Sequence, residues 1–367
     1  MSATERLDLD DPHRFAFDAT VQDAWRREAG AVLVLDRSAF YPEGGGQLAD
    51  RGVLHAGDRE VEVHDVQNDG GRVLHYVSAL VPPGTSISGR LDRARRLEHM
   101  ALHTGQHMLS RAFVDVARAE TRSARLGAQA ATLDLDRPSL ADRLLQAAED
   151  RVNEVVDDDR PVRTRTVTPE EAATLKLRRT PKVLGPVRIV EVEGFDQTPC
   201  GGTHCTRTAQ VGPVKILDVH KHRGGLRVTF AAGRRTRRVL SAESASLRDL
   251  AARFSCAPTD VPGAVAKLER ELRVTRESLG VARKGWATAL ATVLAATPDD
   301  PLVRTLEDLD RDALRSLAQG LTREGSRVVA LAAPQGDTLA IVLARGPEGS
   351  LDCGVLLQSL AAELGGG

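Results

Sequence analysis

Cysteines, aromatic residues and long apolar runs are all scarce in this sequence of 367 residues. Four cysteines do not make a disulfide framework in a chain of this length, so we expect a reducing, cytoplasmic location. No stretch approaches the ~18 consecutive apolar residues of a membrane span. The acidic start, Met1–Asp11, lacks the apolar segment of a secretory signal. These absences exclude a disulfide-stapled secreted domain and predict a protein with no membrane partner.

A formal net charge of −1 conceals a strongly basic segment. Residues 178–238 hold 13 Lys or Arg against 4 Asp or Glu, whereas residues 1–60 hold 12 acids and 7 bases. Such a segment can bind a polyanion, or it can be a solvated face that the acidic start balances. Aromatic residues make up only 3% of the chain, so stacking of many bases is not expected. A nucleic acid would then be recognised by duplex shape and phosphates.

The length exceeds the ~250–300 residues of a single core, so we expect several domains. Residues 13–92 show short apolar or alternating runs, such as Ala31–Leu35 and Val73–Val77, separated by turns rich in Gly and Pro. This pattern predicts a small N-terminal β-barrel within residues 1–92.

The pattern changes to mixed helix and strand after residue 92. Residues 93–117 contain Gly105 but no other Gly or Pro, and their apolar residues recur at helical spacing. A second helix is predicted over 139–156, with strands at 130–135 and 187–192 and a hairpin over 214–230. We therefore expect a central α+β domain over residues 93–235.

The last third of the chain is predicted to be a helical hairpin, residues 236–297, followed by a small α/β domain, residues 298–367. Apolar residues follow one heptad frame from Val265 to Val293, and Pro258 and Pro262 interrupt the helical pattern before it. Such a stripe predicts a packing seam. The whole is thus expected to be an α+β multidomain protein.

Two pairs of residues far apart in the sequence suggest one metal site. His103 and His107 are four residues apart and share one face of the predicted helix. Cys200 and His204 flank a Gly-rich turn. Three imidazoles and one thiolate make a ligand set that suits Zn²⁺, and Gly201 and Gly202 let the backbone bend so that both flanking side chains reach the ion.

The residues next to these four in the sequence restrict the kind of metal site and the choice of ligands. Thr104 stands where zinc peptidases carry the general-base Glu, so this is not a metalloprotease helix. His99 is on the same face and could be a ligand or an orienting neighbour, but we expect a partly exposed bystander. Cys205 is less well placed than Cys200. The site could be closed and structural, or open to a substrate.

Three motifs in this order resemble the editing domain shared by alanyl-tRNA synthetases and the freestanding AlaX proteins. They are FYPEGGGQ at 40–47, followed by Asp50-Arg51-Gly52, then HTGQH at 103–107 and TPCGGTH at 198–204. The resemblance covers residues 13–235. The tail, ending in Leu364 and three glycines, resembles a shortened DHHA1-type domain of the same family. The 12 residues before the resemblance cannot hold an aminoacylation domain, so a freestanding long AlaX form is expected.

The resemblance implies a zinc-dependent hydrolase that deacylates mischarged tRNA for alanine, carrying serine and possibly glycine. Zinc would be held by His103, His107, Cys200 and His204. Gly45, Gly46 and Gln47 would line the pocket, and Thr104 is the candidate for contacting the serine hydroxyl. Read on its own, the triple glycine 44–46 could offer N–H groups to an oxyanion, or form a plain hairpin turn.

The tRNA is the expected partner, held through its phosphates by the basic segment. The expected contacts are Arg234, Arg235, Arg237, Arg238, Lys221 and Arg223, with Arg90, Arg93, Arg95 and Arg96 beside them. The oligomeric state is open, and the C-terminal region is the candidate surface for a dimer. Two alternatives stay open: a zinc-stabilised RNA-binding module without hydrolytic activity, and a general zinc esterase of small molecules.

Overall fold

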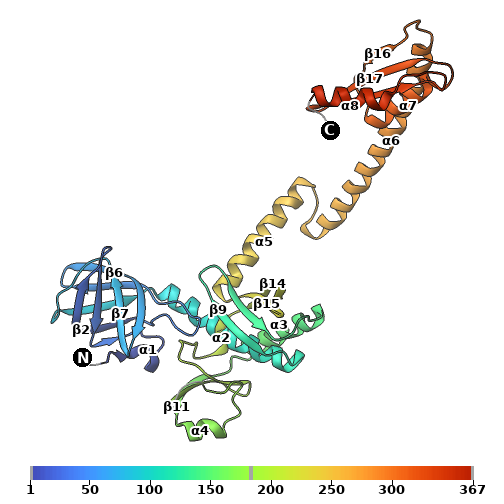
Figure 1. Cartoon of the computed structure of the whole chain (residues 1–367). Coiled ribbons are helices and arrows are strands. Elements are labelled where there is room, and N and C mark those ends of the chain that lie inside the picture. Colours follow the sequence, from blue (N-terminus) through green and yellow to red (C-terminus); the bar gives the residue numbers. More distant parts are fainter. Residues whose placement is uncertain (1–2, 182–184, 365–367) are drawn as a thin grey trace. The chain divides into compact units, whose positions relative to one another are not determined.

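The computed structural model describes residues 3–181 and 185–364, and the chain forms two compact units, Met1–Ala245 and Ser246–Gly367 (Figure 1). Lys182 of the basic segment and the three terminal glycines lie outside the described residues. The first unit contains a barrel, further sheets and the long helix α2, and the second contains α6 and a small sheet. The mixed α+β class and the N-terminal barrel agree with the expectation from sequence.

The N-terminal barrel consists of six antiparallel strands in the closed order β2-β3-β7-β6-β5-β8. The strands are β2 (Ala16–Arg26), β3 (Ala31–Leu35), β5 (Gly52–Ala56), β6 (Arg59–Asp69), β7 (Arg72–Val77) and β8 (Ser86–Leu91). Every second residue of β7 and β8 is buried, as the alternation of side chains along a strand requires. A short parallel pair, β1 (Glu5–Arg6) with β4 (Arg37–Ser38), and the single turn α1 (Leu7–Asp10) complete this region.

The central helix α2 (Arg93–Ala117) has the bounds that the sequence predicts. It begins where the Asp92 side chain accepts a hydrogen bond from the N–H of Arg95, and it ends at Arg118 in the left-handed conformation. Fifteen of its 25 residues are buried, because it packs against both helix α3 (Asp142–Asp157) and strand β15. Such burial fixes the side chains along α2 in space.

The central region places α2 and α3 on an antiparallel sheet of order β14-β15-β10-β9. Its strands are β9 (Thr121–Leu126), β10 (Ala131–Leu135), β14 (Val214–His222) and β15 (Gly225–Ala232). A second sheet contains β11 (Val162–Val167), β12 (Val187–Val192) and β13 (Asp196–Pro199), with α4 (Pro169–Thr174) and the 3-10 turn η1 (Thr208–Val211) nearby in sequence. The core includes Leu109, Phe113, Val152 and Phe230.

The helix α5 (Arg234–Arg253) begins in the first unit, and the second unit contains η2 (Pro258–Asp260), α6 (Val261–Ala295) and a small α/β part. That part has the sheet order β16-β17-β18 and a core that includes Leu302, Leu317 and Leu331. Its elements are β16 (Leu302–Thr305), α7 (Arg311–Leu321), β17 (Val328–Gln335), β18 (Thr338–Arg345) and α8 (Cys353–Leu364).

The heptad stripe of α6 is exposed, in contrast to the packing seam that its sequence predicts. Leu268, Leu272 and Leu279 are each about half exposed, and Val293 is 66% exposed. Among the described residues of α6, Val261 at its start is buried, and Ala287 and Leu294 near its end join the core beneath α7. The apolar repeat therefore predicts the helix correctly but does not predict its burial.

None of the helices within the described residues is both long enough and apolar enough to cross a membrane.

Candidate metal centre

Four side chains predicted as ligands meet at one place in the first unit. His103 and His107 project from α2, and Cys200 and His204 come from the segment that follows β13. Their ligand atoms all lie within 4.8 Å of one another. The three histidines are at most 4% exposed. The group forms a His₃Cys cluster that could hold a metal ion.

The distances inside this cluster fit a small tetrahedral ion. The Cys200 Sγ atom lies 3.3 Å from Nε2 of His103 and 3.3 Å from Nε2 of His204. Tetrahedral zinc with bonds of about 2.0 Å to nitrogen and about 2.3 Å to sulfur separates such donors by about 3.5 Å. The imidazole rings of the three histidines lie 4.3–5.1 Å apart between centroids. Nitrogen and sulfur donors in this arrangement favour zinc over the oxygen-seeking ions Mg²⁺ and Ca²⁺.

Burial keeps the three histidines in the neutral form that a metal ligand requires. It lowers the pKa of His103 to about 3 and the pKa values of His107 and His204 well below their ordinary value. Burial also raises the pKa of the Cys200 thiol, while the Gly202 N–H and the charges of Arg188 and Arg178 act in the opposite direction. A bound cation would displace the thiol proton and gain a thiolate ligand.

Gln47 orients the first of these histidines. Its Oε1 atom lies 2.8 Å from Nδ1 of His103, and its Nε2 donates to Oγ1 of Thr203 over 2.9 Å. Since an amide oxygen only accepts, the His103 proton sits on Nδ1, and Nε2 is left with a free lone pair facing Cys200. Gln47 is fully buried. Gln47 therefore orients a ligand residue through a hydrogen bond.

Thr104 stands behind His204 in a similar way. Its Oγ1 lies 3.2 Å from Nδ1 of His204 and accepts a hydrogen bond from the N–H of Cys205 over 3.0 Å. The Thr104 side chain is fully buried. These bonds tie the hydroxyl to the segment that carries His204, and this contact does not follow from the sequence motif.

Only one of the two glycines between Cys200 and His204 is required for space. A Cβ atom on Gly202 would lie 2.2 Å from Cε1 and 2.4 Å from Nδ1 of His103. A Cβ atom on Gly201 would meet nothing within 4 Å. Neither glycine has a positive φ, so the backbone conformation does not require glycine at these positions. Gly202 is required instead because the ring of His103 lies against it.

The glycines at 44–46 form the turn that presents Gln47. Gly44 and Gln47 exchange both backbone hydrogen bonds, and Gly45 and Gly46 have φ values of +59° and +87°. This is the two-residue turn with positive φ at both central positions. The carbonyl of Gly46 then accepts from the N–H of Leu126 over 2.8 Å. The N–H groups of Gly44 and Gln47 are therefore engaged, and those of Gly45 and Gly46 remain the candidates for an oxyanion.

A buried ion pair joins this loop region to α2. Arg96 is fully buried and binds Asp50 through Nε over 2.9 Å and through Nη2, while Asp50 also accepts from the N–H of Tyr41 over 2.8 Å. The expectation that Arg96 contacts phosphates is therefore wrong, because its guanidinium is not exposed. Asp50 lies in the quoted motif, but its partner could not be identified from sequence.

Arg188 holds the other side of the Cys200 turn. Its Nη1 donates to the carbonyls of Cys200 and Gly202, both over 2.9 Å. It lies within β12, a mostly apolar strand that gives no signal of such a role.

His99 and Cys205 do not join the cluster, although both are close to it in sequence. His99 is 2% exposed, so it is not the partly exposed bystander that we expected. Burial lowers its pKa to about 4. Cys205 is buried, and burial raises the pKa of its thiol to about 12.

The expected phosphate contacts divide into exposed and engaged residues. Lys221, Arg223, Arg234 and Arg237 are exposed. Arg238 is exposed and pairs with Glu98, whereas the side chain of Arg235 is 8% exposed and binds Glu98 over 2.9 Å.

Comparison with known proteins relates the chain to enzymes of alanine tRNA. Residues 14–95 match the family of class II tRNA synthetases (A), and residues 187–228 match the threonyl and alanyl tRNA synthetase second additional domain. The second range contains Cys200 and His204, whereas both ligand histidines of α2 lie outside the two ranges.

Two relatives illustrate the extent of the similarity. The alanine–tRNA ligase of Halorubrum lacusprofundi is 33% identical over 99% of this chain, which spans 40% of the ligase. The alanyl-tRNA editing protein AlaX-L of Pyrococcus horikoshii is 33% identical over 73% of this chain, and the match covers 67% of that protein. The chain spans about two fifths of the length of the ligases that it matches. The chain belongs to the alanyl-tRNA editing family and is homologous to the editing region of alanyl-tRNA synthetase.

Proposed function

We propose that this chain hydrolyses the ester bond between serine and the tRNA for alanine, with the glycine ester as a second substrate. The observation that carries the proposal is the His₃Cys cluster, in which three histidines are buried and Gln47 and Thr104 orient two of them, in a chain related to editing proteins. Both orienting side chains belong to the motifs that carry the family resemblance.

Zinc is the proposed ion, held by His103, His107, Cys200 and His204. When bound in such a site, zinc can orient the substrate's amino group or lower the pKa of a bound water. The protein supplies neutral imidazoles by burying them, and Gln47 fixes the tautomer of His103. Arg188 anchors the carbonyls of Cys200 and Gly202, which keeps the thiol and His204 on the same side of the turn.

The backbone at Gly45 and Gly46 is the proposed source of oxyanion stabilisation. Hydrolysis of an ester develops negative charge on the carbonyl oxygen, and fixed N–H donors stabilise that charge. Both residues are exposed in a turn that is locked by the neighbouring hydrogen bonds of Gly44, Gly46 and Gln47. A locked turn keeps its N–H groups aimed in one direction before the substrate arrives.

Selectivity against alanine requires polar contacts, because alanine is smaller than serine and cannot be excluded by size. A site that hydrogen-bonds the serine hydroxyl leaves its own polar groups unpaired when alanine enters. The hydroxyl of Thr104 remains the sequence-based candidate for this contact. Its bond to the Cys205 N–H fixes its position, and it retains one hydroxyl proton to donate if His204 carries its proton on Nδ1.

A deacylation assay tests the proposal directly. The full chain is incubated with tRNA for alanine charged with serine, glycine or alanine, with and without a chelator, and the zinc content is measured in parallel. We expect release of serine, little release of alanine, and loss of activity on removal of the metal. Binding of tRNA without release of any amino acid would favour the RNA-binding module without catalysis. Hydrolysis of simple esters alone would favour a general esterase.

A metal-ligand variant accompanies this assay. Cys200→Ala should lower the zinc content well below one per chain and abolish deacylation. Stoichiometric zinc in that variant would contradict the assignment of Cys200 as a ligand.

A further inference from the structure

A pocket lies beside α2, on a different side of the helix from the metal cluster. It has a volume of about 540 Å³ and is lined by α2, by the segment from Cys205 to Pro213 and by the start of α5. The α2 residues that line it are Arg93, Leu97, Glu98 and Ala101, which recur at three- and four-residue spacing. His99, His103 and His107 point to roughly the opposite side of the helix, because each residue turns the chain by about 100°.

The centre of this pocket is also displaced along the helix from the metal cluster. Leu97 and His103 are six residues apart, which corresponds to about 9 Å along the axis. With the helix lying between them, the pocket and the cluster cannot both receive one terminal nucleotide. The pocket is therefore a site of its own.

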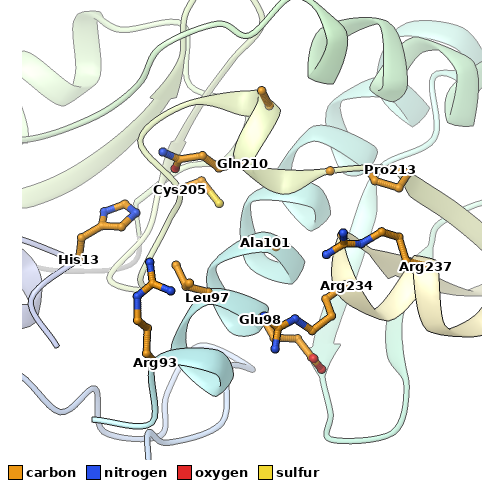
Figure 2. A pocket seen from close by; sticks show the side chains of 13 residues that line it. His13, Arg93, Leu97, Glu98, Ala101, Cys205, Gln210, Pro213, Arg234 and Arg237 are labelled. Carbon is orange, nitrogen blue, oxygen red and sulfur yellow. The ribbon is translucent and has the colours of Figure 1, made fainter. Parts of the chain in front are cut away.

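Figure 2 shows how the charged side chains surround this pocket. Arg93 and His13 lie on one side, Arg234 and Arg237 lie on the other, and Leu97 and Ala101 of α2 lie between them. The N-terminal end of α5, which carries a partial positive charge, is at the same place. The pocket thus offers cations on two sides of an apolar floor.

These three arginines have no carboxylate within ion-pair distance among the described residues. Glu98 is the one acid that lines the pocket, and it is bound by Arg235 over 2.9 Å and by Arg238. Arg93 forms a cation–π pair with the ring of Phe15, at 5.2 Å from the centroid. Guanidinium groups that converge without a counter-charge are the usual arrangement for binding phosphate.

His13 adds a neutral polar group to the same rim. Burial lowers its pKa, and the charges of Arg96 and Arg93 act in the same direction although Asp11 opposes them. The positive charge of the pocket therefore comes from the arginines, and the imidazole is available for hydrogen bonds.

We propose that this pocket binds a backbone segment of the tRNA, with successive phosphates held by Arg93 on one side and by Arg234 and Arg237 on the other. The intervening sugar would lie over Leu97 and Ala101. The inference rests on the proposed function for its tRNA partner, and it separates Arg234 and Arg237, which bind phosphate, from Arg235 and Arg238, which bind Glu98. A free phosphate ion can occupy only one side of the pocket, so we expect it to bind far more weakly.

Direct binding of uncharged tRNA for alanine tests this inference without any hydrolysis. Affinity is measured by fluorescence anisotropy at several salt concentrations for the full chain, Arg93→Ala and Arg234→Ala/Arg237→Ala. Each lost phosphate contact should weaken binding about tenfold and reduce the slope of log affinity against log salt by roughly one. Arg93→Lys keeps the charge and should recover most of the slope.

Arg143→Ala is the matched control. Arg143 is an exposed arginine at the start of α3, and no ion pair is recorded for it among the described residues. Its removal changes the net charge by the same amount as Arg93→Ala, but it lies outside the pocket, so it should change tRNA affinity by less than about twofold. Unchanged affinity and slope in the pocket variants, or an equal loss in Arg143→Ala, would overturn the inference.

Further measurements separate this inference from the proposed function. In the deacylation assay the pocket variants should raise KM and leave kcat and zinc content unchanged. Lost kcat with normal tRNA binding would mean that the arginines serve the reaction, which contradicts the inference. Binding of millimolar inorganic phosphate that the pocket variants abolish, with tRNA binding insensitive to the same variants, would identify a free-anion site and overturn the inference too. If the wild type does not deacylate but the pocket variants still weaken tRNA binding, only the proposed hydrolysis is rejected.

Discussion

The two sides of α2 use the same helix for opposite purposes. On one side, His103 and its neighbours are buried and neutral, and Gln47 and Thr104 bind them with defined geometry. On the other side, Arg93 faces an open pocket together with Arg234 and Arg237. The comparison teaches that chemistry at an ion depends on exact distances, whereas attraction of a polyanion depends on the number of cations. A single substitution on the first side should therefore cause a large loss of activity, whereas each substitution on the second side should cause a smaller loss of tRNA affinity.

Apart from the four ligands themselves, the steepest expected effect is at Gly202. In Gly202→Ala the new methyl group would overlap the ring of His103, which Gln47 holds in place. A displaced ligand should cost about 100-fold or more in deacylation and should lower the zinc content. Gly201→Ala is the matched control and should behave like the wild type, because nothing lies within 4 Å of its added atom. Equal behaviour of the two variants would contradict the close approach of His103.

The next largest effect is expected at Thr104. Thr104→Val removes the oxygen that contacts His204 and accepts from Cys205, and loss of such a partner costs about 10- to 100-fold in metal affinity or activity. Zinc affinity should fall together with release of both amino acids, and release of serine should fall further because the proposed contact to its hydroxyl is lost as well. Thr104→Ser keeps the oxygen and should stay near wild type. A loss confined to the serine substrate, with zinc affinity unchanged, would contradict the role of Thr104 in orienting His204, and an equal loss on both substrates would contradict its contact with the serine hydroxyl.

On the opposite side of α2, Arg235 should affect stability more than tRNA binding. Arg235→Ala leaves Glu98 with one partner and removes a bond of 3.0 Å to the carbonyl of Gly127. We expect a loss of about 1–3 kcal/mol in the free energy of unfolding, measured by denaturant titration. The salt slope of tRNA binding should be nearly unchanged, and a change as large as that of Arg93→Ala would contradict this division of roles.

The smallest effect is expected at Arg238. Its side chain is 61% exposed, and exposed ion pairs contribute about 0–1 kcal/mol. Arg238→Ala should therefore change the free energy of unfolding by less than Arg235→Ala does, in the same denaturant titration. If Arg238→Ala proved the more destabilising of the two, Glu98 would depend chiefly on the exposed arginine.

The sequence predicts much of the fold because the local signals are strong. Apolar residues at helical spacing in a segment without proline predict α2, and the turns around the barrel follow from glycine and proline. The exposed face of α6 could not be predicted, because a heptad pattern records only that apolar residues share a face. Whether that face is buried depends on the elements that pack against it, which the heptad pattern does not specify.

The candidate site shows the same division. The four cluster residues could be predicted because imidazole and thiol at short spacing have few other uses. The contacts of Thr104, Arg96 and Arg188 could not be predicted. The partners of Thr104 and Arg96 lie far away in the sequence, and Arg188 binds a backbone carbonyl, which any residue carries. The spacing of residues along the sequence does not show which of them pair in the folded protein.

Gln47 has a consequence for thermodynamic linkage within the first unit. It lies in the segment between β4 and β5 of the barrel region, whereas His103 lies on α2, and their hydrogen bond makes the cluster depend on docking of the barrel. An ion that binds this cluster would thus favour the docked state by mass action. Conversely, loosening the barrel should release the ion before the helices unfold.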